Sequence, residues 1–304
     1  MGTIGNLKSN ISSNSYICAV IAIILWGLSF VWTKAILDQN IAIFTFLFIR
    51  LSVAGTLLWL FSKISHNLQK VSNKDLLWLL LMAIFEPFIY FIGESYGMLA
   101  TNSATISAVV IATIPVFCII VERMIYKVPF TLTKVIGILI TLPGIGLVVF
   151  EKGNTSVEHL YGIALLFLAV AGATGYGAVV KKVSSKYNSL TIATYQFVLG
   201  AILFLPFFIF GGGIEGLDSN FFTIKVLYPL LSLAILCSCL AFVLWINAIR
   251  GLGITRANIF STLIPAISAI AAAFMGQENI SLTKILGIAI VICGVILAQK
   301  TKKQ

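Results

Sequence analysis

Long apolar stretches alternate with short polar ones along almost the whole chain of 304 residues. A helix needs about 20 predominantly apolar residues, within a range of about 17–25, to cross the hydrocarbon core of a bilayer. The pattern therefore predicts ten transmembrane helices. They cover residues 16–36, 41–62, 76–98, 102–122, 133–150, 161–180, 190–210, 226–249, 254–276 and 282–299.

The basic residues in the polar gaps support this number of helices. If the first gap is cytoplasmic, the inner gaps contain 15 of the 20 Lys and Arg residues, and the outer gaps contain Lys152, Lys225 and Lys284. Membrane proteins carry such an excess of Lys and Arg in their cytoplasmic connections. The distribution predicts that the N- and C-termini are both cytoplasmic.

The second half of the chain repeats the first at a separation of 150 residues. The matched positions are Pro115 with Pro265, Leu132-Thr133-Lys134 with Leu282-Thr283-Lys284, Gly137 with Gly287, and Gly144 with Gly294. Each half, residues 16–150 and 161–299, contains five predicted helices, so the second half must enter the membrane from the opposite side. Inverted repeats of this kind are common in transporters, whose substrate site lies between the halves. The alternative is a duplication without transport.

The composition agrees with an all-α polytopic membrane protein. Charged residues make up 10% of the chain and hydrophobic residues 60%, whereas soluble domains carry about 25% charged residues. The net charge of +10 comes from short gaps between helices rather than from one basic face, so we expect no nucleic-acid partner. The five cysteines lie in apolar stretches without metal-ligand spacing, and we expect no metal and no cofactor.

The most apolar region of the chain holds two acids, Glu86 and Glu94, with Tyr90 between them. The spacing of four residues places all three on one face of a helix. A lone charge at the bilayer centre costs about 2.5–3.5 kcal/mol on insertion scales, so such residues usually have partners. At a rise of 1.5 Å per residue, Arg50 is expected level with Glu86, and Lys34 level with Glu94.

Two interpretations of these charges remain open. In the first, salt bridges neutralise them and hold the first three helices together. In the second, a carboxylate faces a central cavity, where it binds a cationic or amino group or exchanges protons. For Glu86 and Arg50 we leave both open. For Glu94 we favour the cavity, because Gly93 and Gly97 leave room for a ligand beside it.

Other residues complete the predicted cavity less specifically. Trp26 and Trp245 are candidate aromatic walls, although packing is an equally good explanation. Asn247 and Asn258 bracket a short connection in the second half and are candidate polar ligands. The matched prolines, Pro115 and Pro265, are candidate hinges for a rocking motion.

Several stretches resemble the EamA-type drug/metabolite transporters. Trp26-Gly27, followed by Ser29-Phe30 and Lys34, resembles the first-helix signature of that family. Residues 90–117 are similar to its third-to-fourth helix region, and residues 242–270 to the counterpart in the second half. Glu278 followed by Leu282-Thr283 and Gly287 fits its final hairpin; in the first half Val128 stands at the position equivalent to Glu278. The resemblance covers roughly residues 16–299, and it implies ten helices and alternating access.

These observations lead to a functional prediction. We expect a multi-pass cell-membrane protein, a monomer or homodimer in the lipid bilayer, that transports a small polar or amphipathic metabolite. Export of an amino acid is the favoured case, and proton coupling through Glu86 or Glu94 is a hypothesis. The alternatives are a carrier of nucleotide sugars or sugar phosphates and, more remotely, an intramembrane enzyme.

Overall fold

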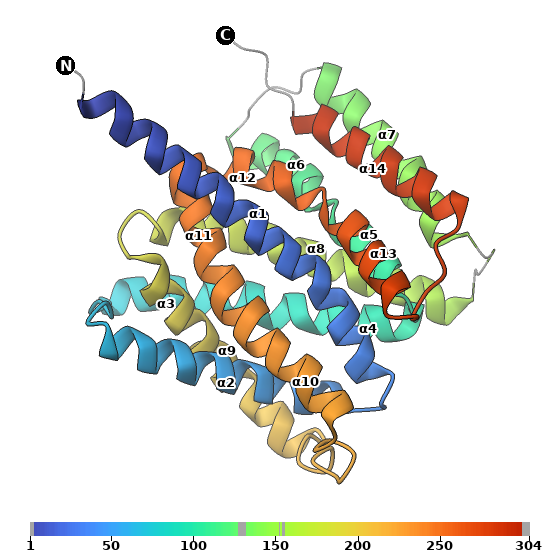
Figure 1. Ribbon diagram of the computed structural model, residues 1–304, viewed down its shortest axis with the longest axis horizontal. Helices are drawn as coiled ribbons and strands as arrows, with labels where there is room; N and C mark the ends of the chain where they lie inside the picture. The colour runs from blue at the N-terminus through green and yellow to red at the C-terminus, as the bar shows by residue number, and fades with distance from the viewer. Residues whose placement is uncertain (1–2, 127–131, 152, 154–155, 300–304) are drawn as a thin grey trace.

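The computed structural model describes residues 3–126, 132–151, 153 and 156–299, and the side chains among them except 3–13, 122–126, 254–256, 259 and 299. Helices make up the regular structure of the described residues (Figure 1). The first half contains α1 (Thr3–Leu37), α2 (Ile43–Ile64), α3 (Asn73–Ala83), η1 (Ile84–Ile89), α4 (Tyr90–Thr101), α5 (Ala104–Ile111), α6 (Ile114–Tyr126) and α7 (Leu132–Val149). The second half contains α8 (Val157–Val183), α9 (Ser189–Phe210), α10 (Ile224–Ser232), η2 (Leu233–Leu240), α11 (Ala241–Leu252), α12 (Ile254–Ser261), α13 (Ile264–Phe274) and α14 (Leu282–Gln299).

The helices follow the apolar pattern of the sequence. Within the described residues, eight helical stretches are long and apolar enough to cross a membrane, judged by length and composition. Two shorter apolar helices, Ile264–Phe274 and Leu282–Ala298, follow them. The total of ten crossings stays a prediction, as does the cytoplasmic side of the two termini.

Large apolar side chains cover the outer faces of the helices. Phe210 and Phe274, for example, are 87% and 89% exposed. Contiguous apolar surface on this scale is unfavourable in water and is expected where a protein meets lipid. The molecule is therefore built to be embedded in a membrane.

Polar contacts gather at the two ends of the helix bundle. At one end, which we call the Glu278 end, Ser103 bonds to Glu278 and Asn220 bonds to the carbonyl of Gln39. At the opposite end, which we call the Lys186 end, Lys186 forms an ion pair with Asp75 at 2.8 Å. The predicted topology places the Glu278 end outside the cell.

Helices α7 and α14 lie side by side at one edge of the molecule (Figure 1). A Cβ atom on Gly137 would lie 2.6 Å from the carbonyl oxygen of Gly294, and one on Gly287 would lie 2.9 Å from that of Gly144. Only glycine permits this approach of two backbones. The 150-residue repeat exchanges these two contacts, since Gly137 corresponds to Gly287 and Gly294 corresponds to Gly144. The two helices run antiparallel, as an inverted repeat requires.

Matched interruptions occur in both halves. The π-helical segments η1 and η2 lie about 150 residues apart, and the breaks at residues 112–113 and 262–263 are 150 apart. Pro115 and Pro265 each stand at the second position of the helix that follows the break. Proline is well tolerated there because the first N–H groups of a helix have no partner within it. The prolines thus begin new helical segments, and their role as hinges stays a prediction.

Candidate functional site

A cavity lies where the interrupted helices of both halves meet. Its first-half lining comes from α1, α2, η1, α4, α5 and α6, and its second-half lining from α8, α11, α12 and α13. Pairs of residues at the 150-residue separation face it together, namely Trp26 with Tyr176, Ile111 with Ser261, and Ile114 with Ile264. The cavity therefore lies on the axis that relates the two repeats, which is where inverted-repeat transporters hold their substrates.

The backbone around the cavity leaves the helical path at Glu86. Its φ of −149° and ψ of 115° are extended, and the next residue, Pro87, has no N–H to donate. Gln196 Nε2 donates to the freed carbonyl of Glu86 at 3.2 Å. Similarly, the carbonyl of Cys237 in η2 of the second half accepts from Trp26 Nε1 of α1 at 3.3 Å. Both irregular segments are thus satisfied inside the protein, as a membrane interior requires.

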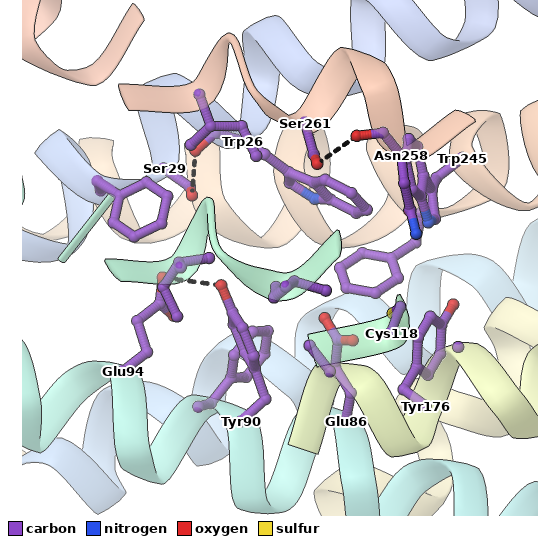
Figure 2. A pocket seen from close by; sticks show the side chains of 18 of the residues that line it. Trp26, Ser29, Glu86, Tyr90, Glu94, Cys118, Tyr176, Trp245, Asn258 and Ser261 are labelled. Atoms are coloured by element: carbon purple, nitrogen blue, oxygen red, sulfur yellow. Dashed lines mark hydrogen bonds between the residues drawn. The ribbon is translucent and has the colours of Figure 1, made fainter. Parts of the chain in front are cut away.

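The two acids differ in their partners. Glu94 is 3% exposed, and the Tyr90 hydroxyl donates to its Oε1 over 3.5 Å, which is a long hydrogen bond. Glu86 is 7% exposed, and no hydrogen bond or ion pair joins its carboxylate to another described residue. Figure 2 shows this carboxylate pointing into the cavity, toward the side where Trp26 and Trp245 lie. We expected Glu94 to be the freer acid, whereas the contacts favour Glu86.

Arg50 does not form the salt bridge considered from the sequence. Its Nε donates to Ser238 Oγ at 2.9 Å, and its guanidinium carbon lies 4.2 Å from the ring centroid of Phe91. No ion pair within 4.0 Å joins it to Glu86 or Glu94 among the described residues. The rise per residue predicts the depth of each charge in the membrane but not the direction of its side chain. Ser238 of η2, in the second half, supplies the polar partner of Arg50.

Lys34 does not form the salt bridge with Glu94 that was one of the two interpretations of these charges. It forms an ion pair with Asp38, which directly follows α1, and it lines a different cavity at the Glu278 end. Asn247 likewise lies outside the central cavity, where its Oδ1 accepts from Ser189 Oγ at 2.8 Å. That bond links α11 to α9, so Asn247 holds two helices together.

The aromatic candidates lie in the central cavity. The rings of Trp26 and Trp245 are 5.1 Å apart, and Phe242 lies 5.0 Å from Trp26. Asn258 lines the same space. Tyr176 and Phe242 also line the cavity and were not predicted from the sequence. The repeat could have indicated Tyr176, because this residue stands 150 positions after Trp26.

No group of three His, Cys, Asp or Glu side chains suited to a metal ion occurs in the part of the chain that the structure describes. The chemistry of the central cavity is that of two carboxylates, one guanidinium and aromatic rings. Such a site binds small molecules by charge and ring contacts.

The sequence profile of the EamA-like transporter family matches this chain twice, over residues 13–150 and 160–299. The chain belongs to the EamA-like transporter family. It is therefore a multi-pass membrane transporter, with a small molecule as its substrate.

Relatives of this EamA protein align over nearly its whole length. An uncharacterized transporter of Archaeoglobus fulgidus is 26% identical over 289 residues, which cover 94% of this chain and 99% of the relative. The uncharacterized transporter YetK of Bacillus subtilis is 26% identical over 294 residues, covering 95% of this chain and 88% of YetK. A protein crystal structure shares the fold, with a TM-score of 0.70 at 13% identity over 94% of this chain and 98% of that one.

A second polar cavity lies at the Glu278 end of this EamA protein. Lys284 Nζ lies 2.9 Å from Glu278 Oε2 and 3.8 Å from Glu151 Oε2. Glu278 Oε1 accepts from Ser103 Oγ at 2.9 Å and from the Thr105 N–H at 3.1 Å. Because Ser103 and Thr105 belong to the first half and Glu278 and Lys284 to the second, the network joins the halves across this end.

The protonation of Glu278 follows from these contacts. Burial by itself would raise the pKa of the carboxyl, but the hydrogen bond and charge of Lys284, together with the Thr105 N–H, lower that pKa below its usual value. Glu278 is thus a carboxylate at neutral pH and holds Lys284 in place.

Proposed function

We propose that this EamA protein is a secondary transporter that exports a small polar or amphipathic metabolite with an amino group, such as an amino acid, by alternating access. The observation that carries the proposal is the buried Glu86 carboxylate, which lies in a cavity between the two repeats and has no hydrogen bond or ion pair with another described residue. A buried charge is retained in a membrane protein mainly where it has a functional role.

The cavity and the contacts at the ends support alternating access. The network of Glu278, Lys284 and Glu151 holds the two halves together at the Glu278 end. The cavity volume is about 80 Å³, below the about 300–1,000 Å³ of sites for drug-sized ligands. Its walls must part to admit cargo, and the matched helix breaks beside Pro115 and Pro265 provide points where segments of both halves can move.

Glu86 is also the candidate for proton coupling. A buried carboxylate without a partner is costly as a free charge, so a proton or a cationic cargo should neutralise it at each step of the cycle. A proton and an amino group would then compete for one position. The other titratable groups that line the cavity are Arg50, Tyr90, Glu94, Cys118 and Tyr176.

The charges of the cavity disfavour a carrier of nucleotide sugars or sugar phosphates. A phosphate group needs several positive or N–H donors. The described lining residues include one basic side chain, Arg50, against two carboxylates. A phosphate in this cavity would meet more negative charge than positive.

A metabolite profile of the culture medium tests the proposed function. Cells would express the native protein, Glu86→Gln, or Glu158→Gln, which alters an exposed carboxylate at the start of α8. We expect a compound with an amino group to accumulate outside with the native protein and with Glu158→Gln, but not with Glu86→Gln. Equal accumulation with Glu86→Gln would contradict the role of Glu86, and accumulation of phosphorylated sugars would contradict the substrate class.

A further inference from the structure

Among the described lining residues, the charged side chains of the central cavity come from one half of the protein. Arg50 lies on α2, Glu86 on η1 and Glu94 on α4, all before residue 150. The second half contributes aromatic and neutral polar side chains to the same space, namely Tyr176, Phe242, Trp245, Asn258 and Ser261. The described charges therefore lie on one wall, whereas rings line both walls, since Trp26 and Tyr90 belong to the first half.

The single guanidinium of the cavity is already engaged. Its Nε bonds to Ser238 and its plane lies near the ring of Phe91. Arg50 is 3% exposed, so a cargo carboxylate would have to compete with these contacts for it. A carboxylate on the cargo would also face the charges of Glu86 and Glu94.

The balance of charge around the cavity is negative. Two carboxylates face it, against one guanidinium, among the lining residues that the structure describes. Glu94 has the Tyr90 hydroxyl as a partner, whereas the Glu86 carboxylate has no hydrogen-bond or ion-pair partner within the described part of the chain. The position opposite Glu86 is suited to a positive group.

The aromatic wall favours the same kind of ligand. By ring centroids, Phe242 lies 5.0 Å and Trp245 5.1 Å from Trp26, and Tyr176 lies 6.3 Å from Phe242. Ring faces attract cations and also pack well against an apolar body. An ammonium at Glu86 would have this wall beside it.

We infer that the cargo carries a net positive charge: an amine with an aromatic or apolar body and no carboxylate, with its ammonium at Glu86 and its body against the rings of the second half. This inference rests on the proposed transport function and narrows its substrate class from metabolites with an amino group to organic cations. An amino acid is zwitterionic and would leave one negative charge of the cavity unbalanced.

Three probes with the same body separate these possibilities. Phenethylamine is a cation, phenylalanine adds a carboxylate to it, and 3-phenylpropionate is an anion. Binding to purified protein is followed through the fluorescence of Trp26 and Trp245, and uptake is measured in proteoliposomes with subtraction of leakage into protein-free liposomes. The variants are Glu86→Gln, Glu86→Asp and the control Glu158→Gln, each checked by thermal unfolding.

We expect phenethylamine to bind and to be transported at least about tenfold better than phenylalanine, since the carboxylate of phenylalanine would lie near the like charges of Glu86 and Glu94. Glu86→Gln should remove this preference, Glu86→Asp should retain part of it, and Glu158→Gln should match the native protein. A preference for phenylalanine or 3-phenylpropionate would overturn the inference and leave transport intact, and so would phenethylamine binding that Glu86→Gln does not change. Absence of binding by all three probes would also overturn it. Binding of phenethylamine without uptake would uphold the charge preference and contradict the transport function.

Discussion

At the residue scale, Glu86 is buried, and its carboxylate has no hydrogen-bond or ion-pair partner among the residues that the structure describes. Stability alone does not favour such a residue, because an unpaired polar group in a low-dielectric interior costs free energy. Glu94 and Arg50, which lie in the same cavity, each have a polar contact. A residue that reduces stability but occupies the cavity wall is expected where function requires it.

Replacement of Glu86 by Gln should therefore raise stability while it removes transport. The amide keeps the shape of the side chain and carries no charge to bury. We expect the free energy of unfolding to rise by about 1–3 kcal/mol, seen as an increase of a few degrees in the melting temperature of the detergent-solubilised protein. Glu158→Gln, on the exposed start of α8, should leave it unchanged. A melting temperature that falls in Glu86→Gln would show that the carboxylate has a stabilising partner.

At the element scale, the sequence predicted the helices but not the directions of their side chains. The apolar pattern placed a helix in each of the ten stretches, and the 150-residue repeat singled out Pro115 and Pro265, which stand beside the two helix breaks. The pattern did not predict η1 and η2, since single-sequence patterns do not distinguish π-helical turns from α-helical ones. The salt bridges considered for Arg50 and Lys34 as one of two interpretations do not occur among the described residues, because depth along a helix says nothing about the face on which a side chain lies.

The packing of α7 against α14 gives an element-scale prediction. A Cβ atom on Gly137 would lie 2.3 Å from the backbone nitrogen of Ala298, which cannot move aside independently of α14. Gly137→Ala should cost about 1–3 kcal/mol or more, measured by thermal unfolding. Gly146, on the same helix, has nothing within 4 Å of the added atom, so Gly146→Ala should be neutral or stabilising. Equal effects of the two changes would contradict the close contact of the helices.

The network of Glu278, Lys284 and Glu151 gives a second element-scale prediction. Lys284→Met leaves two carboxylates without their cation, which loosens the contact between the halves. In a chain carrying Ile106→Cys, whose position lines the second cavity, a membrane-impermeant maleimide should react several-fold faster when Lys284→Met is added. Lys225→Met, an exposed lysine at the same end, is the control, and the chain without Ile106→Cys gives the background of native cysteines. An unchanged rate would show that the network does not close this end.

The pH dependence of this closure follows from the lowered pKa of Glu278. A carboxyl whose pKa is lowered by folding contributes stability above its ordinary pKa, and that contribution is lost as the pH falls through the lowered value. Because the thiolate is the reacting form, the labelling rate of the Ile106→Cys chain is divided by the rate of a free thiol at the same pH. This ratio should thus be constant from about pH 5 to 8. It should rise only in more acidic solution.

At the scale of the whole molecule, the two halves share a fold but differ in chemistry. Symmetry-related positions shape the cavity, and the pairing of Trp26 with Tyr176 follows from the repeat. Among the described lining residues, the first half adds the charges, whereas both halves add rings. Because the two halves repeat one another, the architecture could be predicted from the sequence. The site depends on residues that differ between the halves, and their arrangement could be seen only in the structure.

The central claim is that cargo and proton exchange at Glu86. The most direct test is proton movement in proteoliposomes that contain the purified protein and a pH-sensitive dye inside. Addition of an amine cargo to the outside should drive protons out of the lumen with the native protein and with Glu158→Gln, beyond the change seen in protein-free liposomes, and not with Glu86→Gln. Equal proton movement with Glu86→Gln would contradict the account.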